Sequence, residues 1–347
     1  MGLDLFTPEV MDSVVKVLPP VGSFFKDTFF KNEKKEVSRK IRVDFSKGMR
    51  RIAPFGGINT PTKIAEKIGY VSDEFIAPLV KVKDVTTITD LLVREMGEMV
   101  HSGVNPDERG IHLLADTLMD FNEQISRREE LMCVQAMMDG IIQVEYDGVE
   151  HNVDLGCNNR STVSTLWTNA GATPYKDLQA AALSCSKEGF HKPDICVMER
   201  SAYNAFLWAA KKDEEFKQQS DLYHTMDIKP TYVNENVTFA GRLKDPDMEV
   251  YIYDEWVCNP KTKVTAPIMP KGKILLASTK AKYSMYYGPI MFADEETKRI
   301  RSVIGKRAAD SWVEKDPVAQ MLTLASSPLP IPHEIDSWHV MTVSATE

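Results

Sequence analysis

The feature that most constrains this chain is a long helix, predicted over residues 107–139. Asn105 can cap its N-terminus, Pro106 suits the first helical position, and Gly140 suits a left-handed C-terminal cap. These 33 residues would extend about 50 Å at a rise of 1.5 Å per residue. A helix of this length reaches further than a single small core can cover.

Apolar residues form two stripes on this helix, one on each side of a polar break. The first stripe recurs at three- and four-residue steps until Arg128 interrupts it, and the second resumes at a shifted angle. The first contains Ile111, Leu114, Leu118, Phe121 and Ile125, and the second contains Leu131, Val134, Met138 and Ile141. A coiled coil would need one stripe over several heptads, so that structure is excluded. The polar segment SRREE, residues 126–130, indicates that the helix leaves its own core partway.

The segments before the helix predict an arm and a ribbon. A short amphipathic helix is expected from Pro8 to about Val17, and VSRKIRV, RIAPF and residues 70–88 are predicted to be extended. Prolines and glycines within residues 37–89 exclude a sustained helix and a central strand. We therefore expect a two-stranded ribbon with a loose tip, which needs another surface because an isolated hairpin is marginal in water.

The segments after the helix predict a hairpin, an α/β region and a β-rich tail. Residues 141–156 form the hairpin around Asp147-Gly148. Residues 158–278 alternate helices and strands, and residues 279–347 return to β character. An arm, a ribbon and an over-long helix beside such a region indicate a chain that is incomplete alone. Contacts between copies of such a chain close into rings or extend into shells.

The charge of the chain is unevenly placed. Its net charge is −8, but nine basic and three acidic residues between Lys31 and Arg51 give that segment +6, so the remainder carries −14. Either a nucleic acid or an acidic surface on another copy of the chain would attract a segment of this kind. The sequence leaves both open.

Other features limit location and chemistry. No apolar run is long enough to cross a membrane, and acids near the N-terminus are atypical of a signal peptide. Five singly placed cysteines indicate free thiols in a reducing compartment such as a cytoplasm. His333 and His339 lack the HExxH spacing, and neither a phosphate-binding loop nor a nucleophile elbow occurs. We therefore expect no enzyme, no catalytic residue, no metal and no cofactor.

A series of motifs spans nearly the whole chain. RIAPFG and YVSDEFIAPLVKVKD come first, then RREELMCVQAMMDG followed by VEHNVDLG, which is the most specific pair. DICVMERSAYNAF, KGKILLASTKAKYSMYYGP and the C-terminal WVEKDPVAQMLTLASSPLPIPHEIDSWHVMTV complete the series. In this order the motifs resemble those of the lambda-type major capsid proteins of tailed bacteriophages, the capsid E family.

The resemblance implies an α+β fold of the Hong Kong 97 type. In that fold residues 1–42 would be an N-terminal arm, 43–89 an extended β loop, 90–157 with 279–347 a peripheral domain around the long helix, and 158–278 an α/β axial domain. It also implies a major capsid protein that forms pentamers and hexamers of an icosahedral shell. Such a shell encloses double-stranded phage DNA and expands from a procapsid.

The resemblance also implies partners and a location. The partners would be further copies of the chain together with scaffolding, portal and decoration proteins, with non-specific contact to packaged DNA and none to a membrane. The protein would lie in the virion capsid after assembly in the bacterial host cytoplasm. Some relatives cross-link a loop Lys to a peripheral Asn. Lys63 or Lys67 would fit the first role, but residues 279–347 contain no Asn, so we expect a decoration protein instead of this bond.

Seven charged residues are candidates for the contacts between subunits. They are Arg50, Arg51, Lys63 and Lys67 on the basic arm and loop, with Glu123, Glu129 and Glu130 on the long helix as acidic partners. Solvated surface charge is the alternative for each of them. For the whole chain, an encapsulin-like nanocompartment shell and a motif-poor α/β enzyme stay open as alternatives.

Overall fold

The computed structural model describes residues 22–46, 70–87, 106–146, 149–157, 159–212, 226–227, 231–234, 236–259, 262–294, 299–315 and 318–345. Three predicted features lie outside the described residues: the helix from Pro8 to about Val17, the strand RIAPF, and the turn at Asp147-Gly148.

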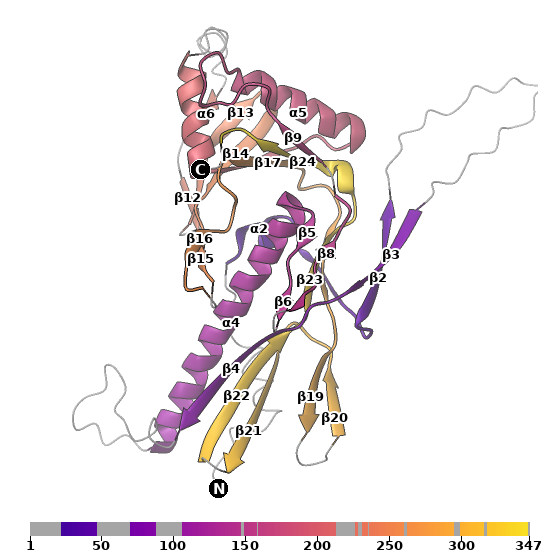
Figure 1. Ribbon diagram of the computed structural model, residues 1–347, viewed down its shortest axis with the longest axis vertical. Coiled ribbons are helices and arrows are strands. Elements are labelled where there is room, and N and C mark those ends of the chain that lie inside the picture. The colour runs from indigo at the N-terminus through magenta and orange to yellow at the C-terminus, as the bar shows by residue number, and fades with distance from the viewer. Residues whose placement is uncertain are drawn as a thin grey trace, which may run out of the picture.

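The long helix is confirmed as α4 (Pro106–Met138), which runs along the body of the molecule in Figure 1. Its first apolar stripe packs through Leu118 and Ile125 on a sheet of three antiparallel strands. These strands are β4 (Val80–Thr87), β22 (Val318–Ser326) and β21 (Ala308–Lys315). The second stripe enters a larger apolar cluster through Val134 and Met138. The shift between the two stripes therefore marks the passage of one helix from one core to another.

Gly140 ends α4 as its sequence position predicts. Its φ is +61°, in the left-handed region that favours glycine. A Cβ built on this residue would lie 2.8 Å from the carbonyl oxygen of Cys157. The predicted hairpin follows at once. Its strands are β5 (Ile141–Ile142) with β8 (Val153–Asp154), and β6 (Glu145–Tyr146) with β7 (Val149–Glu150).

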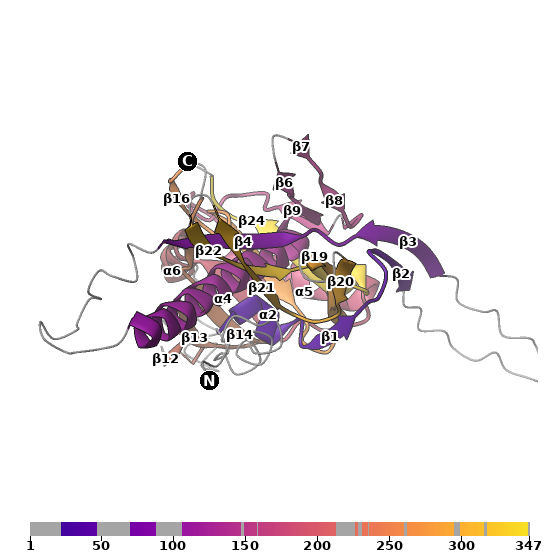
Figure 2. The ribbon, with the colours of Figure 1, turned by 90° about the horizontal axis from the view of Figure 1, so that it is seen from below.

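The predicted ribbon is confirmed over part of its length. Strand β2 (Lys40–Ser46) pairs antiparallel with β3 (Tyr70–Ile76), and Figure 2 shows the pair projecting to one side of the body. The returning segment then changes partner, because β4 pairs with β22 instead of continuing the ribbon. Pro78, which lacks a backbone N–H, lies between β3 and β4 where the exchange takes place.

The N-terminal part of the described chain lies on the second half of α4. Helix α2 (Phe24–Thr28) contacts α4 and precedes β1 (Asn32–Lys35). Strand β1 pairs parallel with β18 (Tyr283–Tyr287), which pairs antiparallel with β23 (Pro328–Pro332). A separate hairpin, β19 (Ile290–Asp294) with β20 (Arg299–Val303), lies beside β21 in Figure 1.

The α/β region contains an eight-stranded sheet in the order β11-β13-β14-β10-β17-β24-β9, with β12 paired to β13. Helices α5 (Pro174–Glu188) and α6 (Arg200–Lys212) pack on it. The strands are β9 (Arg160–Thr162), β10 (Ile195–Glu199), β11 (Met226–Asp227), β12 (Thr231–Asn234), β13 (Val237–Lys244), β14 (Asp247–Tyr253), β17 (Lys273–Ala277) and β24 (Trp338–Thr342). A hairpin of β15 (Trp256–Cys258) and β16 (Thr265–Pro267) follows β14, and a 3-10 turn η1 (Ile335–Ser337) precedes β24. Strand β24 belongs to the C-terminal segment but joins this sheet. The domain boundaries expected from the sequence, including the one at residue 278, stay a prediction.

Two further sequence-based expectations concern the cysteines and membrane-spanning helices. All five cysteines are free, and Cys258 is the exposed one. No helix among the described residues combines the length and the apolar character needed to cross a membrane.

Candidate functional site

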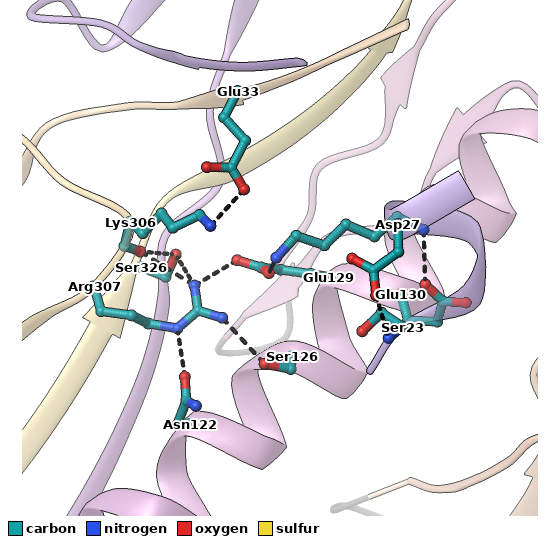
Figure 3. A network of polar contacts seen from close by, with 11 residues as sticks. Ser23, Asp27, Glu33, Asn122, Ser126, Glu129, Glu130, Lys306, Arg307 and Ser326 are labelled. Carbon is teal, nitrogen blue, oxygen red and sulfur yellow. Dashed lines mark hydrogen bonds and ion pairs between the residues drawn. The ribbon is translucent and has the colours of Figure 1, made fainter. Parts of the chain in front are cut away.

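A buried charge network lies where α4 passes between its two cores (Figure 3). At its centre is Glu129, which is fully buried. One of its carboxylate oxygens lies 2.6 Å from Lys26 Nζ of α2, and the other lies 2.5 Å from a terminal guanidinium nitrogen of Arg307. Glu129 thus joins three segments that are far apart in the sequence.

Arg307 precedes β21 and distributes its donors over several acceptors. Besides Glu129, it donates to Asn122 Oδ1 at 3.3 Å, to Ser126 Oγ at 3.3 Å and to Ser326 Oγ at 3.1 Å. Burial alone raises the pKa of Glu129, but the charges and hydrogen bonds of Arg307 and Lys26 outweigh burial, so this pKa falls below its ordinary value. Glu129 is therefore ionised in the folded subunit at neutral pH.

Glu130 is also buried but has different partners. Adjacent helical residues point about 100° apart, so its carboxyl group faces α2 and β14 instead of Arg307. Its oxygens accept hydrogen bonds from the backbone N–H of Phe25 at 2.7 Å and of Lys26 at 3.1 Å. The Tyr253 hydroxyl lies 3.1 Å from the same carboxyl group. Burial raises the pKa of Glu130 to about 7, since the hydrogen bonds only partly offset desolvation and Glu255 adds repulsion.

The two carboxyl groups hold the subunit together at one point. Glu129 ties α4 to α2 and to the segment before β21, and Glu130 ties α4 to the backbone of α2 and to the end of β14. Removing one partner of a buried ion pair is destabilising by about 3–5 kcal/mol, because the other charge stays buried. The network therefore fixes the arrangement of these segments. Among the described residues, no group of His, Cys, Asp and Glu side chains could hold a metal ion.

The structure places the predicted contact residues in three different situations. Arg50, Arg51, Lys63 and Lys67 lie outside the described residues. Glu123 is half-exposed and pairs with Arg127 of the next helical turn at 2.7 Å. The sequence predicts surface positions for Glu129 and Glu130, and the structure corrects this expectation: both are buried, with partners in their own chain.

Sequence reasoning did not find Lys26, Tyr253 or Arg307 as partners of these carboxylates. Arg307 is 178 residues from Glu129, and Tyr253 is 123 residues from Glu130, so no local spacing signals either contact. The usable signal was the SRREE break itself. A polar segment between two apolar stripes of one helix marks either solvent or a buried network, and both occur here, because Arg127 and Arg128 are exposed.

Comparison with known proteins shows the class to which this architecture belongs. A model of the family described as phage major capsid protein E matches residues 7–343. The chain therefore belongs to the phage major capsid protein E family, whose members are structural proteins of the virion, and it functions as a major capsid protein. No curated protein matches the sequence.

Solved structures show the same fold at low sequence identity. A putative prophage capsid protein from E. coli CFT073 superposes with a TM-score of 0.69 and 15% identity, covering 97% of this chain and 99% of that one. A phage-related protein from Bordetella bronchiseptica RB50 gives a TM-score of 0.52 and 12% identity, covering 96% and 95% of the two chains. The predicted α+β fold of the Hong Kong 97 type is confirmed.

Proposed function

We propose that this major capsid protein assembles as hexamers and pentamers into an icosahedral shell around double-stranded phage DNA, and that the shell expands from a procapsid. The family match over residues 7–343 carries this proposal. The structure supports it physically, because the β2–β3 ribbon projects from the body and has no third strand among the described residues. One face of the ribbon is buried in the large core of its own subunit through Ile41, Val43 and Phe45, so a neighbouring copy would contact the other side.

The contacts between subunits are proposed to be partly electrostatic. The basic residues Arg50, Arg51, Lys63 and Lys67 would meet acidic side chains on the first half of a neighbour's α4. Glu123 belongs to this acidic face, and Asp116 and Asp120 are exposed on the same helix. Attraction of this kind would direct how the subunits meet and would weaken with ionic strength, since the Debye length is about 10 Å at 0.1 M salt.

The remaining partners follow from the proposed role. Scaffolding, portal and decoration proteins would act with the shell, and packaged DNA would contact it without base specificity. Assembly would take place in the bacterial host cytoplasm, with the protein acting as a building unit and not as an enzyme. We propose reinforcement by a decoration protein instead of a Lys–Asn cross-link, because residues 279–347 contain no Asn.

The test is overexpression of the full chain, followed by sedimentation and negative-stain electron microscopy at low and high ionic strength. Shells, tubes or capsomers are expected at low ionic strength, with fewer at high ionic strength. A variant carrying Arg50→Gln and Arg51→Gln should assemble less at low salt, while Arg128→Gln, at an exposed site on α4, serves as the matched control. A chain that stays monomeric at every salt concentration would contradict the proposal.

A further inference from the structure

Around Glu130, two carboxyl groups share a single hydroxyl hydrogen. The hydroxyl of Tyr253 lies between two carboxyl groups, 3.1 Å from Glu130 and 2.8 Å from Glu255. A tyrosine hydroxyl has a single hydrogen, so it can donate to one of them at a time. If both carboxyl groups are ionised, one of them faces an oxygen lone pair. If Glu130 is protonated, it can donate to the Tyr253 oxygen while Tyr253 donates to Glu255, and every contact is satisfied.

Among the described residues, Glu130 also forms no ion pair with a cation. Among the ion pairs of the described residues, Lys26 is engaged with Glu129 and Arg127 with Glu123. The titratable groups that interact with Glu130 are Tyr253, which ends β14, Glu255 just after it, and Cys133 on α4. Further charges lie around them: Glu129, Lys26 and Asp27 interact with Cys133, and Arg127 interacts with Glu255. An ionised Glu130 would therefore be buried beside the ionised Glu129 and near a third carboxyl group, which is unfavourable.

We propose that Glu130, Tyr253 and Glu255 form a proton-controlled clasp, which holds residues 23–30 on α4 when Glu130 is protonated and releases them more readily when it is ionised. The segment that the clasp holds is rich in aromatic side chains. Phe24, Phe25 and Phe29 pack in the large core, with the Phe25 ring edge-on to Tyr253. Release would expose this apolar surface and free the N-terminal segment to contact a second copy of the chain.

The direction of the pH dependence follows from linkage. The pKa of Glu130 is raised by burial from its ordinary 4.5 to about 7 in the closed clasp. The closed state thus binds more protons than the open state between these two values, and opening becomes easier as pH rises through this window. Above about pH 7 both states are ionised and the effect levels off. The pKa of Glu255 is also raised, chiefly by its burial, so two carboxyl groups with raised pKa values share the single hydrogen of Tyr253.

Hydrogen exchange of the full-length chain, measured by mass spectrometry between pH 5 and 8 and corrected for intrinsic exchange, tests the clasp. Protection of residues 23–30 is expected to fall by up to about tenfold per pH unit to about pH 7 and then to level off. The hairpin strand Arg299–Val303, which is partly exposed and exchanges through local opening, is the internal reference, with unchanged protection. A flat profile for residues 23–30 in the wild-type chain would overturn the proposal, whether or not shells form.

Variants assign the effect to its residues. Glu130→Gln imitates the protonated side chain and should keep residues 23–30 protected at every pH. Glu255→Gln should end the fall at a lower pH and make it smaller, because Tyr253 can then donate to Glu130. Glu188→Gln, at an exposed position at the end of α5, is the control and should keep the wild-type profile. A wild-type pH profile in both Glu130→Gln and Glu255→Gln would refute the clasp, and circular dichroism confirms that each variant is folded.

Discussion

The two halves of α4 show how one helix can belong to two cores. The first half lies on the three-stranded sheet, where Leu118 and Ile125 meet Leu322 and Leu324. The second half is surrounded by side chains from α2, β18, β23 and the α/β sheet. The first half thus has one partner layer and an exposed side, whereas the second half is part of the interior. The two halves meet at residues 126–130, which we call the junction. The buried carboxyl groups of the junction are tolerated because cations and backbone N–H groups from other segments contact them.

This difference bears on assembly. A helix half that is exposed on one side can offer that side to a neighbouring subunit without unfolding anything. The second half cannot do so, since it holds α2 and the α/β sheet in place. We therefore expect substitutions at the junction to disturb the subunit itself, and substitutions on the exposed side of the first half to disturb contacts between subunits.

The largest expected effect is at the junction, in Arg307→Met. This change removes the cation that lies 2.5 Å from the fully buried Glu129. The unfolding free energy should fall by about 3–5 kcal/mol, because a buried carboxylate is left with Lys26 alone. Urea unfolding monitored by fluorescence measures the loss. Adding Glu129→Gln to Arg307→Met should restore part of it, and a double variant as unstable as the single one would contradict the charge explanation.

The adjacent carboxyl groups should produce opposite pH dependences of stability. The pKa of Glu129 is lowered in the folded state, so its contribution is present above its unfolded value and is lost as pH falls through the folded one. The pKa of Glu130 is raised to about 7, so its contribution is present below about pH 4.5 and is lost as pH rises toward 7, by about 3 kcal/mol.

Unfolding free energies of the wild type, Glu129→Gln and Glu130→Gln at pH 3 to 8 separate the two contributions. Glu130→Gln should flatten the decline between about pH 4.5 and 7 and keep the decline at acidic pH. Glu129→Gln should flatten the decline at acidic pH and keep the decline between about pH 4.5 and 7. Parallel curves for the two variants would show that the two carboxyl groups are not electrostatically distinct.

A smaller effect should distinguish the two cores directly. Ile125 in the first core and Ile142 in the second are both fully buried, so Ile→Val at each site is a matched pair. The loss should be about 0.5 kcal/mol for Ile125→Val and about 1.5 kcal/mol for Ile142→Val, because the thinner first core can relax around a missing methylene. Equal losses by urea unfolding would indicate that the cores are equally rigid.

The sequence was sufficient for the features set by short spacing. Asn105, Pro106 and Gly140 gave the bounds of the helix to within one residue. The prediction that the helix leaves its core at residues 126–130 was wrong, because its second half enters a larger core. Long-range pairing could not be predicted in this way. The exchange of partner after Pro78 depends on β22, more than 200 residues away in the sequence, and the burial of Glu129 depends on Arg307. A helix pattern shows that residues 126–130 are polar, but not whether water or a distant cation meets each one.

The smallest expected effect on the stability of the subunit is at Glu123, on the exposed side of the first half of α4. Its ion pair with Arg127 is half-exposed, so Glu123→Gln should change the unfolding free energy by only about 0.3–0.5 kcal/mol. If Glu123 also meets a basic residue of a neighbour, the same variant should reduce assembly at low ionic strength and resemble the wild type at high ionic strength. Sedimentation measures this difference, with Arg128→Gln as the control. Reduced assembly of Glu123→Gln at all salt concentrations would point to a packing role for Glu123 instead of a charge contact.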